Sequence, residues 1–206
     1  DSIYDQKVNL FYGRDYITEK ICGLRFKINA KTFFQTNSTQ AEKLFYLVKK
    51  FLEPSKNDIL YDLYSGIGTI GQILSKDVKK VVGIDIVEDS INFANENSKL
   101  NNLSNTKYFS GDMKDIFTEA FIKENGKPSV SIVNPPREGI DKKVIEKIID
   151  TKPKKIVYVS CNSSTLARDL FIFQKTYEIS KLQTIDMFPH TSHVENVVLL
   201  KKLIDV

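Results

Sequence analysis

The chain has 206 residues, of which 41% are hydrophobic and 27% are charged, and its formal net charge is +4. This composition can build a core, which argues against an intrinsically disordered chain, and the length suits one sizeable domain with an appendage. Its longest apolar runs are far shorter than the ~20 residues that span a bilayer, so we expect no membrane contact. Two cysteines form no disulfide framework, and we expect a reducing, cytoplasmic location.

The first part of the chain has the pattern of short strands. Leu24, Phe26 and Ile28 alternate with charged residues, which predicts a strand with one buried face. We therefore predict that residues 1–36 form a β-rich entry segment, the remnant of a preceding domain. Residues 37–206 are predicted to form the main domain.

Beyond residue 37, helical and strand patterns alternate. The predicted strands are 59–63, 81–86, 106–110, 129–133, 156–160, 177–187 and 194–202. The predicted helices begin at about 38, where Asn37 or Ser38 is a capping residue, and then cover 69–76, 89–100, 113–124, 141–150 and 164–175. Strands that alternate with helices predict an α/β fold, with a mostly parallel sheet covered on both faces.

In such sheets ligands bind beyond the carboxyl ends of the strands, and the residues at those ends indicate a nucleoside cofactor. Gly66, Gly68 and Gly71 follow the first strand of the alternating region with the spacing of a glycine-rich nucleotide loop. Asp85 follows the second strand, where a carboxylate can accept hydrogen bonds from ribose hydroxyls. Asp112 follows the third, where it can meet an adenine amino group. Ordinary turn glycines are the alternative interpretation of the loop alone.

The charge ahead of the glycine loop bears on which cofactor binds. Asp62 would repel the pyrophosphate of a dinucleotide, but it can face a cationic amino group. S-adenosylmethionine carries an ammonium group and a sulfonium and has no phosphate. The sequence therefore favours S-adenosylmethionine over a nicotinamide cofactor, and an NAD-dependent oxidoreductase is disfavoured.

Two further strand ends carry possible substrate chemistry. The fourth strand ends in Asn134 and two prolines, which predict a rigid pocket wall or, alternatively, a plain turn. The fifth ends at Cys161, just before a helix whose partial positive charge is expected to lower the thiol pKa. An inert buried cysteine is the alternative there, and we interpret Cys22 as structural. His190 and His193 have no partner at zinc-ligand spacing, so no metal site is predicted.

Taken together, these residues make the chain resemble the S-adenosylmethionine-dependent RNA 5-methyluridine (uracil-5-) methyltransferases. The matching stretches are Phe33–Asn37, Asp62–Thr69, Asn134–Gly139, Tyr158–Asn162, Thr165–Asp169 and Asp186–Glu195. The last stretch resembles the 23S ribosomal RNA branch more than the transfer RNA branch. The resemblance implies a Rossmann-like methyltransferase fold with a mostly parallel seven-stranded sheet and an antiparallel last strand.

The resemblance also implies roles for individual residues. Cys161 is the expected nucleophile at carbon 6 of uracil, and Glu195 is the expected base that removes the proton from carbon 5. The cofactor residues it implies, together with those of the glycine loop, are Gln35, Tyr64, Gly66, Gly68, Thr69, Asp85, Asp112 and Asn134. The substrate residues that we predict are Gln35, Arg137, Asn162 and Arg168.

The chain departs from the family in ways that leave other interpretations open. Asn134 stands where the family usually has Asp, so no role that needs a carboxylate is assigned there. The family's RNA-binding OB-type domain and the clustered cysteines of its iron–sulfur domain are absent, so we expect a catalytic C-terminal portion, monomeric and acting on RNA. The alternatives are a transfer RNA enzyme, an enzyme that methylates exocyclic amino groups, and an inactive cofactor- or RNA-binding fragment.

Overall fold

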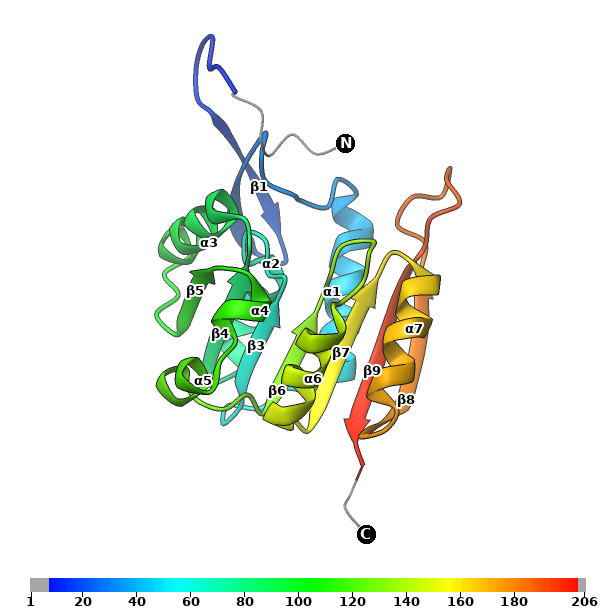
Figure 1. Cartoon of the computed structure of the whole chain (residues 1–206). Coiled ribbons are helices and arrows are strands. Elements are labelled where there is room, and N and C mark those ends of the chain that lie inside the picture. Colours follow the sequence, from blue (N-terminus) through cyan, green and yellow to red (C-terminus); the bar gives the residue numbers. More distant parts are fainter. Residues whose placement is uncertain (1–7, 204–206) are drawn as a thin grey trace.

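The computed structural model describes residues 8–203, which form a three-layer α/β fold with a separate hairpin (Figure 1). Its strands are β1 (Tyr16–Ile21), β2 (Leu24–Asn29), β3 (Ile59–Leu63), β4 (Lys80–Asp85), β5 (Thr106–Ser110), β6 (Val130–Val133), β7 (Lys155–Ser160), β8 (Tyr177–Ile185) and β9 (Glu195–Lys202). Its helices are α1 (Ser38–Leu52), α2 (Thr69–Leu74), the 3-10 turn η1 (Ser75–Asp77), α3 (Glu88–Leu100), α4 (Met113–Ile116), α5 (Glu119–Asn125), α6 (Lys142–Thr151) and α7 (Ser163–Phe173).

The main sheet has seven strands in the order β5-β4-β3-β6-β7-β9-β8. The pairs from β5 to β7 are all parallel, and β9 pairs antiparallel with both β7 and β8. The prediction of a mostly parallel sheet with an antiparallel last strand is confirmed. The chain leaves β3 toward β4 on one side and later returns to β6 on the other. The carboxyl ends of β3 and β6 therefore flank the point where ligands bind in such folds.

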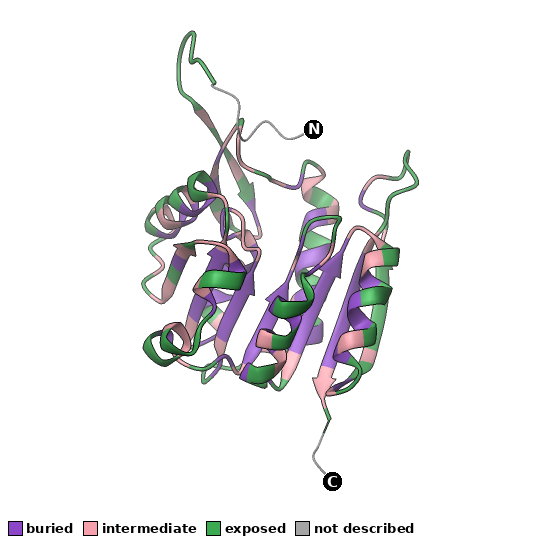
Figure 2. Ribbon diagram, viewed as in Figure 1, coloured by how far each residue is buried: buried purple, intermediate pink, exposed green. Residues whose placement is uncertain are grey.

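Both faces of the inner strands β4, β3, β6, β7 and β9 are buried, as Figure 2 shows by their purple colour, whereas the edge strand β8 is mostly exposed. Leu60 belongs to the core under α1, whereas its neighbour Tyr61 belongs to the core under α6 and α7. Alternate residues of one strand thus enter opposite cores, because successive side chains point to opposite faces. Asn37 caps α1 by accepting a hydrogen bond of 3.2 Å from the Gln40 amide.

The N-terminal hairpin packs onto the same fold. Phe26 is buried in the core under α1, which confirms the predicted alternation in β2. Two asparagines complete the exposed edge of β2: Asn97 of α3 accepts 2.7 Å from the Lys27 amide, and Asn101, which caps the end of α3, accepts 2.9 Å from the Arg25 amide. Side chains thus replace a neighbouring strand. A domain boundary at residue 36 stays a prediction, and residues 1–7 of that segment lie outside the described residues.

One predicted helix is wrong. The stretch 113–124 forms two short helices, α4 and α5, with a break at Phe117 and Thr118. The Thr118 hydroxyl accepts 3.2 Å from the Phe121 amide and so starts a new helix. Phe117 is 2% exposed and packs 5.8 Å from Tyr61, ring centre to ring centre. Burial of the Phe117 ring in the core stabilises the fold more than a continuous helix over 113–124 would. Within residues 8–203, no helix is long and apolar enough to cross a membrane.

Candidate active site

A cavity of about 630 Å³ opens at the carboxyl ends of β4, β5 and β6. Asp85 and Asp112, the acids predicted from the strand ends, both line it, and Tyr64 borders it from the end of β3. Gly139 and Ile140 form the opposite wall. Its position beside the glycine loop and its two carboxylates suit a nucleoside.

Asp85 holds the glycine loop as well as facing the cavity. Its Oδ2 accepts 2.8 Å from the Gly66 amide, and its Oδ1 accepts 2.9 Å from the Val87 amide. Burial raises the pKa of this carboxyl, and the two amides oppose that shift. Each carboxylate oxygen has a further lone pair, so the group can still accept from two ribose hydroxyls.

Gly68 of the loop and Gly83 of β4 both pack closely against one buried tyrosine. The Tyr108 hydroxyl donates 3.2 Å to the Gly68 carbonyl, and Gly68 has φ +78°, which favours glycine. A Cβ on Gly83, in the middle of β4, would lie 2.1 Å from the Tyr108 ring. Tyr108 therefore supports the loop from below, a role that sequence reasoning missed because the three residues are distant in the chain.

Asp62 is a buried carboxyl with an unsatisfied oxygen among the described residues. It is 1% exposed; its Oδ2 accepts 2.9 Å from the Gly71 amide, and its Oδ1 has no hydrogen-bond partner among the described residues. Burial, aided by the nearby charge of Asp85, raises the pKa of Asp62 to about 7. An uncompensated buried oxygen is costly, so a ligand that donates hydrogen bonds fits here.

A smaller cavity joins Asp62 to several predicted cofactor residues. Gln35, Thr69 and Asn134 line it together with Asp62. Tyr64 lines both this cavity and the larger one, and it has φ +62°, an uncommon conformation for a bulky residue. The amino-acid end and the nucleoside end of S-adenosylmethionine can therefore lie on either side of Tyr64.

A third cavity, of about 270 Å³, contains the predicted nucleophile. Cys161, Arg137 and His193 line it, and Arg137 Nη2 lies 3.4 Å from His193 Nε2. Ser160 pairs with Asn196 across β7 and β9. The residues Cys161 and Glu195 therefore adjoin at the same end of two neighbouring antiparallel strands.

The electrostatics of Cys161 differ from the sequence prediction. Burial, and next the negative charge of Glu195, raise the pKa of the Cys161 thiol, while Arg137 lowers it by its charge and a hydrogen bond. The predicted lowering by the helix N-terminus is therefore wrong, because burial and a neighbouring carboxylate outweigh it. Burial also raises the pKa of Glu195, again opposed by Arg137.

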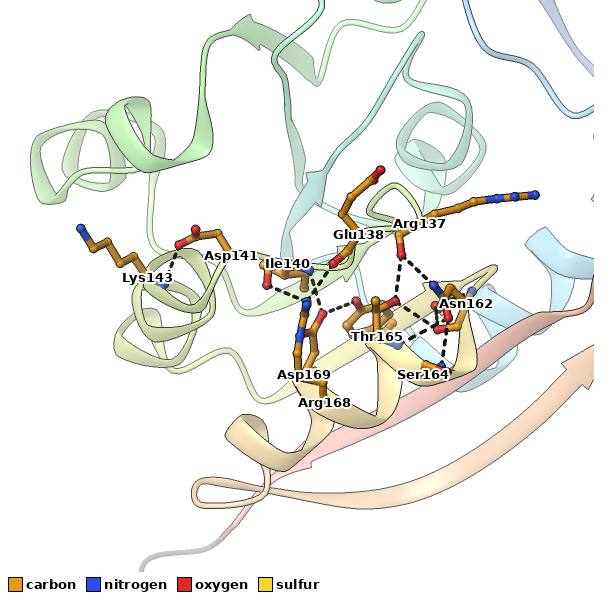
Figure 3. A network of polar contacts seen from close by, with 12 residues as sticks. Arg137, Glu138, Ile140, Asp141, Lys143, Asn162, Ser164, Thr165, Arg168 and Asp169 are labelled. Atoms are coloured by element: carbon orange, nitrogen blue, oxygen red, sulfur yellow. Dashed lines mark hydrogen bonds and ion pairs between the residues drawn. The ribbon is translucent and has the colours of Figure 1, made fainter. Parts of the chain in front are cut away.

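The other predicted substrate residues make structural contacts. Asn162 caps α7 through its Oδ1, which accepts 3.0 Å from the Ser164 amide, and its Nδ2 donates 3.0 Å to the Arg137 carbonyl. Arg168 Nη2 donates 2.9 Å to the Glu138 carbonyl, as Figure 3 shows. A role for Arg168 in RNA binding stays a prediction.

The structure thus brings the predicted residues into two adjoining groups. Asn134, Arg137 and Gly139 belong to one loop, which reaches from the cofactor cavities to the cavity of Cys161. The Asn37 side chain donates 3.0 Å to the Met187 carbonyl and so ties two distant motifs together. No three His, Cys, Asp or Glu side chains within residues 8–203 gather to hold a metal ion.

Curated relatives share this region over nearly its whole length. An RNA methyltransferase from Porphyromonas gingivalis, itself uncharacterized, is 48% identical over 202 residues, 97% of this chain and 43% of that protein. A similarly described protein from Bacteroides thetaiotaomicron is 44% identical over 201 residues, 98% of this chain and 44% of that protein. The chain therefore spans less than half the length of these relatives.

Solved structures and the family profile agree with this likeness. The Pyrococcus abyssi tRNA (uracil-54, C5)-methyltransferase, solved with S-adenosyl-L-homocysteine, is 35% identical with a TM-score of 0.79, and the match covers 92% of this chain and 45% of that one. The Methanocaldococcus jannaschii tRNA m1G37 methyltransferase, at 20% identity and a TM-score of 0.69 over 94% of this chain and 59% of that one, shares the fold. The profile described as tRNA (uracil-5-)-methyltransferase matches residues 4–203, so the chain belongs to that family.

Proposed function

We propose that this chain is the catalytic region of an RNA methyltransferase that uses S-adenosylmethionine and methylates carbon 5 of a uridine. One arrangement carries this proposal. Cys161 and Arg137 line one cavity, and Glu195 adjoins Cys161 at the start of the neighbouring strand β9. The loop that carries Arg137 continues with Glu138 and Gly139 into the wall of the larger cavity. The Pyrococcus abyssi relative, whose name gives the same reaction and whose structure contains S-adenosyl-L-homocysteine, supports it.

The residues of the two cofactor cavities fit S-adenosylmethionine. The unpartnered Oδ1 of Asp62 suits the ammonium group, while Asp85 suits the ribose hydroxyls and Asp112 the adenine amino group. Gly66 lines the smaller cavity and lets the backbone approach the ligand, whereas Gly68 is a predicted contact that lines neither cavity. The remaining predicted contacts are Gln35, Tyr64, Thr69 and Asn134. Bound there, the cofactor supplies an electrophilic methyl group.

The residues around Cys161 supply the remaining chemistry. Carbon 5 of uracil is a poor nucleophile, so the Cys161 thiolate first adds to carbon 6, and the resulting enolate makes carbon 5 nucleophilic. Arg137 stabilises the thiolate by its charge and hydrogen bond. Once carbon 5 carries the methyl group, Glu195 removes its proton, and elimination releases the Cys161 sulfur and 5-methyluracil.

Recognition of the RNA falls to exposed residues at the mouth of this cavity. Arg137 is exposed there and suits a phosphate or a base edge, and Asn162 lines the same cavity. Gln35, another predicted contact, is buried and lines the smaller cofactor cavity instead. The target base must leave its stack to enter, at a cost of a few kcal/mol. The likeness of the 186–195 stretch favours 23S ribosomal RNA, whereas the solved uracil-5 relative acts on transfer RNA.

Methyl transfer from labelled S-adenosylmethionine tests the proposal. Wild-type protein is incubated with transcripts of 23S ribosomal RNA fragments and of transfer RNA, and 5-methyluridine is identified by mass spectrometry. We expect 5-methyluridine from wild type and none from Cys161→Ala. Both proteins should bind S-adenosylhomocysteine equally in calorimetry. Methylation at an exocyclic nitrogen, or cofactor binding with no methylation of any RNA, would contradict the proposal.

A further inference from the structure

Asp169 is a buried carboxylate that the proposed reaction does not use. It is 0% exposed, and both of its oxygens accept hydrogen bonds. Oδ2 accepts 2.7 Å from the Ile140 amide and 2.8 Å from the Tyr158 hydroxyl. Oδ1 accepts 2.9 Å from Arg168 Nε and 2.8 Å from Arg168 Nη2. A buried charge is tolerated only when it is satisfied in this way.

These bonds fasten the loop after β6 to helix α7 (Figure 3). Arg168 extends the connection, because its Nη2 also donates 2.9 Å to the Glu138 carbonyl and 3.3 Å to the Ile140 carbonyl. Between these residues Gly139 has φ +76°, and a Cβ there would lie 2.6 Å from both Arg168 Nη2 and Asp169 Oδ2. The loop therefore approaches α7 as closely as a backbone without side chain allows.

The same loop carries Arg137, and the backbone of Arg137 is hydrogen-bonded to residues at the start of α7. The Arg137 carbonyl accepts 3.0 Å from Asn162 Nδ2 and 3.0 Å from the Thr165 hydroxyl. Its side chain extends away from this contact in Figure 3 and lines the cavity of Cys161. Because Cys161 comes just two residues before α7, the nucleophile and Arg137 are attached to one rigid helix end.

We propose that Asp169 is a positioning residue: through Arg168 and the Ile140 amide it holds the loop on α7, and so keeps the Arg137 guanidinium beside Cys161. The importance of that position rests on the function proposed above. The groups that face the thiol are Arg137, Glu195 and the neighbouring His193. Arg137 is the side chain that lowers the pKa of Cys161, in addition to a backbone hydrogen bond, so a loosened loop leaves less thiolate.

Alkylation of Cys161 by iodoacetamide across pH tests this without RNA or cofactor. Peptide mass spectrometry follows Cys161, with Cys22 as an internal reference in the same sample. Asp169→Asn keeps the side-chain size but gives up one acceptor oxygen, and Arg168→Met removes the donors to the loop. We expect both changes to slow alkylation of Cys161 at neutral pH by about three- to tenfold, because a pKa rise of about one unit lowers the thiolate fraction tenfold.

Asp58→Asn is the matched control. Asp58 is also a buried carboxylate, 2% exposed and paired with Lys154 at 2.7 Å, but it lies at the opposite end of β3 from the glycine loop. The Asp58→Asn variant should leave the alkylation profile of Cys161 unchanged. It therefore separates a general loss of stability from a change in the position of Arg137. Thermal unfolding establishes that each variant folds. If Asp169→Asn does not fold, the alkylation rate of Arg168→Met tests the proposal in its place.

The double variant Arg137→Met/Asp169→Asn shows whether Asp169 acts through Arg137. We expect it to react no more slowly than Arg137→Met alone, since coupled residues are non-additive. The proposal would be overturned if Asp169→Asn slowed alkylation equally in the wild-type protein and in Arg137→Met. It would also be overturned if Asp169→Asn shifted the pH profile of Cys161 alkylation no further than Asp58→Asn does. Methylation by Cys161→Ala would instead refute the proposed role of Cys161 as nucleophile and leave these alkylation results unaffected.

Discussion

Glu195 raises the pKa of the Cys161 thiol across the junction between β9 and β7. Burial raises this pKa most and the charge of Glu195 adds to it, so the charge of the base reduces how much thiolate is present. Replacing Glu195 by Gln removes that negative charge and should lower the pKa of Cys161. We expect faster alkylation of Cys161 by iodoacetamide at pH 7.5, by up to about tenfold. Slower alkylation would show that Glu195 promotes the thiolate instead.

The same Glu195→Gln variant should stall the reaction after methyl transfer. Without a base at this position the proton on carbon 5 cannot leave, so the Cys161 adduct persists. Turnover is expected to fall by roughly 10²- to 10⁴-fold, the usual contribution of general base catalysis. Gel electrophoresis under denaturing conditions should show a protein–RNA complex that carries the labelled methyl group. Unchanged turnover would show that a group other than Glu195 removes the proton from carbon 5.

Cofactor affinity should depend on pH through Asp62. Its pKa in the free protein is raised to about 7, and the ammonium group of the ligand binds the carboxylate form. As pH falls through 7 the carboxyl takes up a proton, so affinity is lost on the acid side and retained on the basic side. We expect binding of S-adenosylhomocysteine to weaken roughly tenfold between pH 8 and pH 6.

Calorimetry of Asp62→Asn provides the control for this pH dependence. The amide oxygen can still accept from the Gly71 amide, which preserves the loop. The variant should bind more weakly at pH 8 and show a flat profile between pH 6 and pH 8. A slope equal to that of wild type would place the titrating group elsewhere.

The close packing around Tyr108 predicts a large effect on stability. An alanine at Gly83 would place a methyl group 2.1 Å from the buried ring of Tyr108, so either this ring or strand β4 must move. We expect the free energy of unfolding to fall by about 1–3 kcal/mol, measured by urea denaturation. Gly111→Ala, whose nearest neighbour would lie at 3.3 Å, is the comparison and should change stability less.

The sequence predicts most of the fold because its strands are short apolar runs with strong flanking signals. Strands 59–63 and 106–110 are confirmed at both ends. Helix 113–124 was wrong because Phe117 continues the apolar stripe, and only the tertiary contact with Tyr61 shows that the ring is needed in the core. Local pattern cannot reveal which of several apolar residues a distant neighbour will fix.

The sequence also predicts which residues meet at the candidate site, but not their electrostatics. The acids at strand ends, Asp85 and Asp112, do line one cavity, because topology alone places such residues together. The pKa direction of Cys161 was not predictable, since it depends on burial and on Glu195, 34 positions later in the chain. The burial of Asp169, on which its proposed role rests, was not predictable because a helical Asp carries no sequence signal of its burial.

Covalent trapping on RNA that contains 5-fluorouridine tests the central claim most directly. Fluorine at carbon 5 cannot leave as a proton, so the adduct formed by Cys161 cannot be resolved. Wild-type protein with S-adenosylmethionine should give a complex stable to denaturant, whose RNA-linked peptide contains Cys161, and Cys161→Ala should give none. A complex with the Cys161→Ala protein, or 5-methyluridine formed on ordinary RNA without any trapped complex, would contradict the account.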